Sequence, residues 1–142
     1  MEHSSEERGR GIVTATYGSQ SLVRTCAGAT LVATKRKKVL PLCVGDEVHF
    51  HHLEASHVIV DAVCERHRSF FEPLARGVRY LATGIDFIWV VASPVPRMPD
   101  ETLDRYMIAA TAAHIPMIII RNKADIEDHL LDNALDHYTS LN

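Results

Sequence analysis

Residues 118–125 read Ile-Ile-Ile-Arg-Asn-Lys-Ala-Asp, so that a strongly apolar run passes directly into the tetrapeptide Asn-Lys-x-Asp. The apolar run Met117–Ile120 is typical of a strand that is buried on both faces, as in parallel sheets. An earlier run of the same kind lies within Asp86–Ser93 and is stopped by Pro94. Open α/β sheets bind their ligands at the carboxyl ends of the strands, which is where the tetrapeptide lies. The stretch therefore predicts an α/β unit with a candidate ligand site after its second strand.

Two amphipathic helices are expected around that second strand. The first begins at Asp100 and runs to about His114, with acidic residues at the end where the helix dipole favours them. The order β-α-β-α is the start of a doubly wound sheet. Because two strands and two helices do not complete such a sheet, we expect residues 73–142 to be the first part of a larger domain. The second helix is marked by apolar residues at helical spacing, namely Ile126, Leu130, Leu131, Ala134 and Tyr138.

The N-terminal half has a different pattern, with five short β-type runs separated by turn residues. Strands this short and closely spaced fit a small closed barrel, which leaves no exposed edges. We therefore predict an all-β, five-stranded OB-like barrel over residues 10–72, with an SH3-like barrel as the alternative, after a flexible N-terminus at residues 1–9. The expected strands are Ile12–Tyr17, Ser21–Cys26, Thr30–Thr34, Asp46–His51 and His57–Cys64.

The composition of the 142-residue chain is that of an ordinary globular protein, with 46% hydrophobic residues, 23% charged residues and a net charge of −3. Its cysteines, Cys26, Cys43 and Cys64, form no Cys-x-x-Cys pair and are expected to be reduced thiols. No signal-like or membrane-spanning stretch is visible, so we expect a cytoplasmic protein without a membrane partner. His49 and His51 would share a strand face, but no second ligand pair occurs at metal spacing, and we expect no metal site in the chain.

Positive charge is concentrated in the N-terminal half. Residues 10–72 carry eight positive and six negative charges, whereas residues 73–142 carry six positive and nine negative charges. Basic side chains in such an excess are candidates for contact with RNA phosphates, although a short basic run is also typical of a solvated loop. The candidates are Lys35, Arg36, Lys37, Lys38, Arg66 and Arg68.

The tetrapeptide has side chains suited to reading guanine. A carboxylate at Asp125 can accept hydrogen bonds from both N1–H and the exocyclic amine of guanine, a donor pair that adenine lacks. Asn122 can brace the loop and reach the base edge, and the stem of Lys123 can lie over the ring while its charge stays in water. We therefore name Asn122, Lys123 and Asp125 as candidate guanine-binding residues.

No phosphate-binding loop precedes the tetrapeptide. An ordinary GTPase carries G-x-x-x-x-G-K-[ST] far upstream of this point, and the chain contains no such motif. The nucleotide site is therefore either built in a permuted order or absent. Phosphoryl transfer depends on a phosphate cradle, a lysine and Mg²⁺, so we expect no catalytic residue in this chain and no GTP hydrolysis by it.

An ordered series of short motifs resembles the ribosome small-subunit-dependent GTPase A family, the circularly permuted bacterial GTPases of the RsgA/YjeQ type. The resemblance spans roughly residues 11–126 and covers the N-terminal portion of the family only. It rests on Gly11-Ile12-Val13, Val44-Gly45-Asp46-Glu47-Val48, Arg66-His67-Arg68-Ser69, Gly84-Ile85-Asp86, Ala92-Ser93-Pro94-Val95-Pro96, Leu103-Asp104-Arg105-Tyr106, Ala112-Ala113-His114-Ile115-Pro116 and Asn122-Lys123-Ala124-Asp125.

The resemblance implies a barrel that binds ribosomal RNA, a permuted GTPase domain with the guanine motif first, and action late in maturation of the small (30S) ribosomal subunit. It further implies GTP or GDP with Mg²⁺ as ligands and a zinc-binding C-terminal module. The phosphate loop, Mg²⁺ ligands and zinc ligands would all lie beyond Asn142, so the chain would be truncated before the phosphate loop. No DNA partner is implied.

Two positions depart from the family pattern. Arg121 stands where the family usually has an apolar strand residue, and Phe70-Phe71 replaces a more aliphatic and basic stretch. The alternative function is a non-enzymatic RNA- or ribosome-binding module in which Asn-Lys-x-Asp is incidental. A third hypothesis is a small protein-interaction barrel with a helical tail.

Overall fold

The structure, a computed structural model, describes residues 7–139. Its contacts divide the chain into two compact units, Met1–Ile85 and Asp86–Asn142. The predicted fold class, a five-stranded OB-like barrel followed by β-α-β-α, is confirmed. Among the described residues, every helix is too short or too polar to span a membrane.

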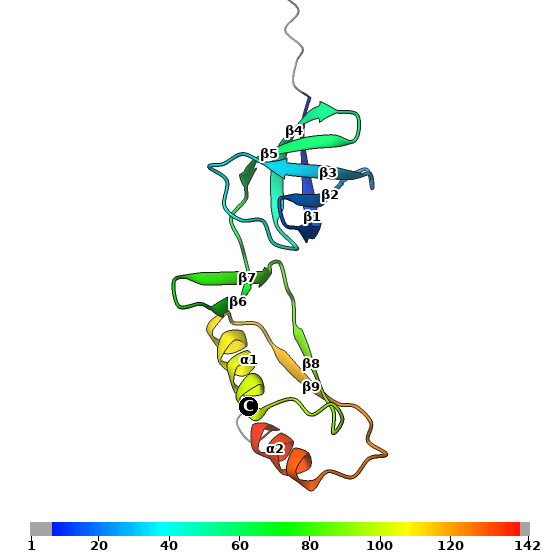
Figure 1. Ribbon diagram of the computed structural model, residues 1–142, viewed down its shortest axis with the longest axis vertical. Helices are drawn as coiled ribbons and strands as arrows, with labels where there is room; N and C mark the ends of the chain where they lie inside the picture. Colours follow the sequence, from blue (N-terminus) through cyan, green and yellow to red (C-terminus); the bar gives the residue numbers. More distant parts are fainter. Residues whose placement is uncertain (1–6, 140–142) are drawn as a thin grey trace, which may run out of the picture. The chain divides into compact units, whose positions relative to one another are not determined.

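The barrel of the first unit is closed, with the strand order β1-β2-β3-β5-β4 (Figure 1). Neighbouring strands are antiparallel except for β3 and β5, which are parallel, and β1 closes the barrel by pairing with β4. β1 begins at Arg8, inside the segment predicted to be flexible, because Arg8 pairs with His51 of β4. Residues 1–6 of that segment lie outside the described residues. The strands are β1 (Arg8–Tyr17), β2 (Gln20–Thr25), β3 (Thr30–Lys35), β4 (Glu47–Glu54) and β5 (His57–Val63).

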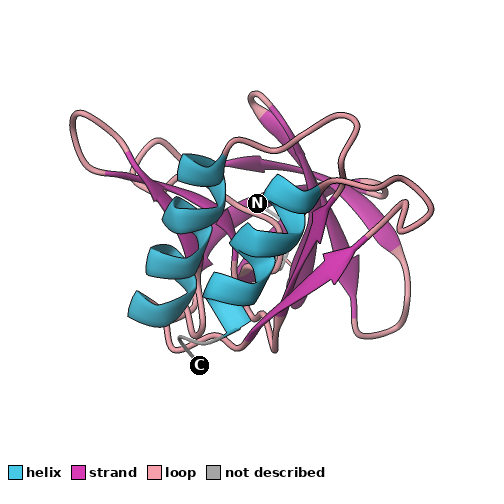
Figure 2. Ribbon diagram, turned by 90° about the horizontal axis from the view of Figure 1, so that it is seen from below, coloured by secondary structure: helices cyan, strands magenta, loops and turns pink. Residues whose placement is uncertain are grey.

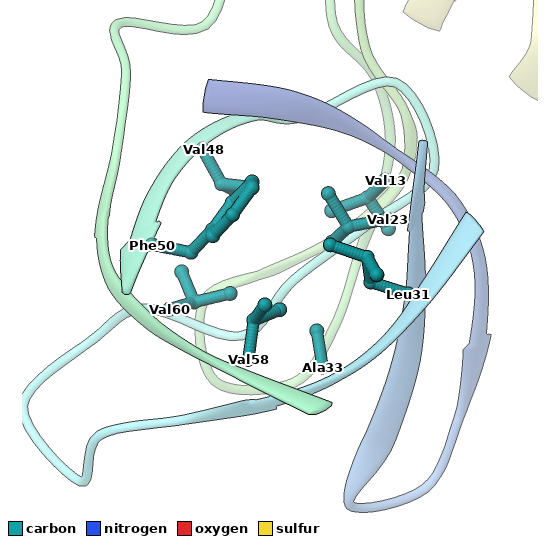
Figure 3. Close-up of a cluster of buried hydrophobic side chains, with 8 residues drawn as sticks. All are labelled: Val13, Val23, Leu31, Ala33, Val48, Phe50, Val58 and Val60. Atoms are coloured by element: carbon teal, nitrogen blue, oxygen red, sulfur yellow. The ribbon is translucent and has the colours of Figure 1, made fainter. Parts of the chain in front are cut away.

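One apolar cluster fills the barrel (Figure 3). Every strand contributes to it, and β3, β4 and β5 each contribute two alternate residues, because successive side chains of a strand point to opposite faces. Phe50 is the largest member, and Gly9 of β1 leaves room for its ring, since a Cβ at Gly9 would lie 2.6 Å from two ring carbons. The cluster consists of Val13, Val23, Leu31, Ala33, Val48, Phe50, Val58 and Val60.

A hairpin that the sequence reading missed extends the first unit beyond the barrel. It consists of β6 (Phe70–Pro73) and β7 (Val78–Ala82), and Ala82 bridges to Val44 just before β4. Gly45 permits this approach, because it has a φ of 91° and a Cβ there would lie 2.0 Å from the Thr83 carbonyl oxygen. The division between units therefore falls after Ile85, later than the predicted boundary between residues 72 and 73, which would cut the hairpin.

A buried ion pair links the start of β4 to the segment after β5. Asp46 has no exposed surface, and its two carboxylate oxygens accept hydrogen bonds from Nε and Nη2 of Arg66, each at 2.7 Å. The backbone N–H of Cys43 donates to the same carboxylate at 2.8 Å. The Arg66 guanidinium also lies 4.3 Å from the ring centroid of Tyr80 in β7. The Asp46–Arg66 pair thus joins the barrel to the hairpin.

The second unit is built from β8 (Ile88–Ala92), α1 (Asp100–Ala112), β9 (Met117–Arg121) and α2 (His129–Thr139). β8 and β9 are parallel, with Ala92 opposite Arg121. Both helices lie side by side (Figure 2), and the hydroxyl of Tyr138 in α2 donates to Asp104 of α1 at 2.6 Å. The unit's core joins one face of this sheet to both helices and contains the buried residues Val90, Leu103 and Tyr138.

The second helix begins later than its apolar pattern predicted. Ile126 lies in the loop before α2, and its backbone N–H donates to the Lys123 carbonyl. Asp128 caps the helix instead, because its Oδ1 accepts hydrogen bonds from the backbone N–H groups of Leu130 and Leu131, both at 3.1 Å. Such a carboxylate satisfies N–H groups that have no partner within the helix.

The buried pair predicts a large loss of stability on removing its negative charge. Asp46→Asn should lower the free energy of unfolding of the first unit by about 3 kcal/mol, because a buried guanidinium then lacks its counter-charge. The measurement is urea unfolding followed by the NMR signals of the barrel. Glu47→Gln is the matched control, since Glu47 pairs with Arg10 at the surface and exposed pairs contribute little. Equal losses in the two variants would contradict the assignment.

Burial of Cys43 predicts a specific sensitivity to alkali. Burial, followed by the neighbouring Asp46 carboxylate, raises the pKa of the Cys43 thiol to about 11. The folded state therefore holds this proton more tightly than the unfolded state, so its stability falls as the pH rises through the range from about 9 to 11. The free energy of unfolding should fall more steeply over that range in the wild type than in Cys43→Ala. Identical slopes, or alkylation of Cys43 at pH 8 as fast as that of exposed Cys26, would contradict this.

Candidate guanine-nucleotide site

The tetrapeptide lies at the carboxyl ends of the two parallel strands, as predicted. The backbone N–H of Asn122 donates to the Ala92 carbonyl at 2.8 Å, which extends the pairing of β8 and β9 by one bond. The loop that carries Asn122, Lys123 and Asp125 begins there and leads to α2. Its first residue is therefore anchored to the neighbouring strand.

Asn122 and Lys123 define the conformation of the loop. Lys123 has a φ of 53°, a left-handed value that is uncommon for a residue other than glycine. The side-chain Oδ1 of Asn122 accepts a hydrogen bond from the Lys123 backbone N–H at 2.9 Å. The Lys123 carbonyl in turn accepts from the Ile126 N–H at 3.0 Å, which closes a turn around Ala124 and Asp125. Asn122 thus braces the loop through its side chain.

An open hollow of about 400 Å³ adjoins the loop. The Lys123 ammonium donates to the Val95 carbonyl at 2.5 Å, so the lysine stem connects the loop to the segment after β8. Asp125 is exposed and follows in the same loop, outside the lining of the hollow. The lining combines apolar and polar side chains, as is common in ligand sites. It consists of Val91, Ser93, Val95, Pro96, Arg97, Met98, Asn122 and Lys123.

Arg121 is one of the departures from the family pattern noted in the sequence. Its guanidinium lies against the Asn122–Asp125 loop. Its guanidinium donates to Asp132 of α2 and to the carbonyls of Lys123 and Ile126. The hydrogen bond to Asp132 raises the pKa of Arg121, and Asp128 and Asp125 act in the same direction. The sequence showed Arg121 as a departure from the family pattern but did not predict its contacts with the loop. The available signal was a charged residue at the end of an apolar strand.

The candidate RNA-binding residues lie in the first unit and fall into two environments. All of residues 35–38 are exposed; Lys35 donates to the Val39 carbonyl at 2.9 Å and Arg36 pairs with Asp61 at 2.8 Å. These four residues, here called the basic loop, are the last residue of β3 and the three residues that follow it.

The remaining two candidates follow β5. The side chain of Arg66 is only 11% exposed because it is bound to Asp46, so it has little surface to offer a phosphate. Arg68 is exposed and has a φ of 48°. The structure thus separates Arg66, as a buried structural residue, from the exposed lysines of the basic loop.

The described chain is thus a closed barrel followed by β-α-β, with Asn-Lys-x-Asp after the second parallel strand. Two solved structures have this fold: YloQ, described as a circularly permuted GTPase (TM-score 0.61, 22% identity, 99% of this chain and 50% of that chain), and YjeQ from Thermotoga maritima (TM-score 0.63, 20% identity, 95% and 47%).

Curated relatives carry the name small ribosomal subunit biogenesis GTPase RsgA. The protein of Neisseria meningitidis serogroup C is 32% identical over 130 residues, which are 91% of this chain and 42% of the relative. That of Shewanella oneidensis is 32% identical over 142 aligned positions, covering 92% of this chain and 40% of the relative. No protein-family model matches the chain. The resemblance to the N-terminal portion of the RsgA/YjeQ-type family is confirmed, and the chain spans about two-fifths of the length of these relatives.

Proposed function

We propose that this chain is the N-terminal portion of a ribosome-associated GTPase that acts in late maturation of the small ribosomal subunit. In this proposal the barrel binds ribosomal RNA and the Asn-Lys-x-Asp loop selects the guanine base. The carrying observation is the position of Asn-Lys-x-Asp at the carboxyl ends of two parallel strands, in a chain whose relatives are named small-subunit biogenesis GTPases. Such a protein would work in the cytoplasm, with the small subunit and guanine nucleotide as its partners.

Base recognition follows from the groups that the loop presents. Asp125 is exposed, and a carboxylate can accept from both N1–H and the exocyclic amine of guanine. The Lys123 stem borders a hollow of about 400 Å³. Asn122 holds the backbone of the loop. Adenine would leave the carboxylate without its two donors, which is the basis of discrimination against it.

Hydrolysis of GTP to GDP and phosphate is proposed for the whole protein and not for these residues. In this proposal the phosphate loop and the Mg²⁺ and zinc ligands of the whole protein would follow the tetrapeptide, and no residue of this chain is assigned to any of them. What the chain's own residues contribute is selection and orientation of the base.

RNA binding is assigned to the basic loop and Arg68. Lys37 and Lys38 are exposed, and Arg36 is held beside them by Asp61, whose other oxygen lies 2.7 Å from Nδ1 of buried His51. Arg66 is not assigned to RNA binding because its guanidinium is already paired with the Asp46 carboxylate. Phosphate contacts of this kind give affinity that depends on salt and little on sequence.

Guanosine should bind weakly and selectively to the isolated chain. Without phosphate contacts we expect a dissociation constant on the order of millimolar, with adenosine weaker by about tenfold because it lacks the donor pair. Asp125→Ala should abolish this preference. The measurement is titration of the ¹⁵N-labelled protein with each nucleoside, and Asp136→Ala on α2 serves as the matched control. Equal shifts with guanosine and adenosine would contradict the guanine site and favour the non-enzymatic RNA-binding module.

Removal of the exposed side chains of Lys37 and Lys38 should weaken RNA binding in a salt-dependent way. For Lys37→Ala/Lys38→Ala, the slope of log affinity against log salt for small-subunit RNA should fall in magnitude by about 1.4 to 1.8, as expected for two lost phosphate contacts. Filter binding at several salt concentrations measures the slope. Arg24→Ala, an exposed cation on β2, is the control and should leave the slope nearly unchanged. An unchanged slope in the double variant would remove the basic loop from the interface.

A further inference from the structure

We propose that Arg121 is the positioning residue of the Asn122–Asp125 loop, acting as a brace between that loop and helix α2. This inference rests on the proposed guanine site and adds to it a residue that sets its specificity. Arg121 is the last residue of β9, and its side chain is 21% exposed. It would make no contact with the base itself.

All three nitrogens of the Arg121 guanidinium have acceptors. Nε donates to Asp132 Oδ1 at 2.5 Å, Nη1 donates to the Lys123 carbonyl at 3.2 Å, and Nη2 donates to the Ile126 carbonyl at 3.0 Å. A planar guanidinium offers five donors in a fixed fork, so it can bind several acceptors in one plane. An apolar residue at this position could make none of these bonds.

The two carbonyls are the ends of the turn that contains Asp125. The Lys123 carbonyl already accepts from the Ile126 N–H, so Arg121 binds both ends of a single closed turn. The left-handed backbone at Lys123 is a sparsely populated conformation that persists only where the surroundings hold it. The brace therefore limits the backbone positions from which the Asp125 carboxylate can project.

The third acceptor ties this turn to a rigid element. Asp132 lies in the first turn of α2, and the start of that helix is fixed by the Asp128 cap. Arg121 thus connects the strand end, the loop and the helix. Its positive charge also lies among the carboxylates of Asp125, Asp128 and Asp132, which would otherwise repel one another.

Fixing the carboxylate matters for specificity because two hydrogen bonds must form at once. A site discriminates between guanine and an analogue without the exocyclic amine only if its acceptors are held in position, since a mobile carboxylate can adapt to either. Inosine is that analogue. The wild type should therefore prefer guanosine over inosine, and loosening the loop should reduce the preference.

The test compares Arg121→Met with Arg121→Lys in the 142-residue chain. In Arg121→Met, amide hydrogen exchange at Ile126 should be about tenfold faster, because its turn has lost the brace, while barrel amides keep their wild-type rates. The ratio of guanosine to inosine affinity, measured by NMR titration, should fall toward one. Arg121→Lys keeps the charge but lacks the fork, so it should restore neither the exchange rate nor the ratio in full.

Arg105→Met is the matched control, since Arg105 is an exposed residue of α1 in the same unit and the charge change is the same. Unchanged Ile126 exchange in Arg121→Met would overturn the brace, and so would equal weakening of guanosine and inosine binding. If Arg121→Met unfolds the second unit, Asp132→Asn replaces it: faster Ile126 exchange supports the tie to α2, and an unchanged rate overturns it. Wild-type protein that does not prefer guanosine to adenosine would refute the guanine site, whereas the exchange rates still decide the brace.

Discussion

A forked arginine–aspartate pair holds irregular backbone in place in each of the two units. In the first unit, Arg66 binds Asp46, a carboxylate with no exposed surface, and joins the barrel to the β6–β7 hairpin. In the second unit, Arg121 binds Asp132 and joins the Asn-Lys-x-Asp loop to α2. Both pairs use the planar fork of arginine, which binds a carboxylate and keeps a donor for a backbone carbonyl. Regular strands and helices satisfy their own backbone, so such pairs are needed where loops must keep one conformation.

This arrangement gives the two units different chemistry. The barrel presents an exposed basic loop on a scaffold whose interior is a single apolar cluster. The second unit presents a short polar loop where two parallel strands end. These strands leave Trp89, Val91 and Ile118 exposed, so the prediction that both are buried on both faces is wrong. In the proposed function the first surface meets phosphates and the second meets a base, so salt should affect the two activities very differently.

Elements whose apolar residues recur at a regular spacing could be predicted from the sequence. Elements whose position is fixed by single polar contacts could not. Alternating residues around Val48 and Phe50 indicated the barrel, and the apolar runs before Pro94 and Asn122 indicated the parallel strands. The β6–β7 hairpin was missed because its short strands contain no fully buried residue and lack a clear alternation. The start of α2 was misplaced because Ile126 continues the apolar spacing, while the Asp128 cap decides where the helix begins.

The candidate site shows the same division. The tetrapeptide was visible as a motif, and its position after β9 follows from the strand. In the sequence, Arg66 looks like the other basic residues. It is bound within the fold because it pairs with Asp46, which lies twenty residues earlier in the chain. Arg121 is a single departure from the sequence pattern, and its proposed role in holding the loop depends on Asp132 in the helix that follows. Contacts between residues distant in sequence carry no local pattern that a single sequence could reveal.

The most direct test of this account is a pair of ¹⁵N chemical-shift maps of the same protein, one with guanosine and one with small-subunit ribosomal RNA. The account predicts two separate sets of shifted signals: guanosine moves residues of the hollow and of the loop 121–126, and RNA moves the basic loop. Guanosine shifts confined to the barrel, or RNA shifts centred on the Asn-Lys-x-Asp loop, would contradict it.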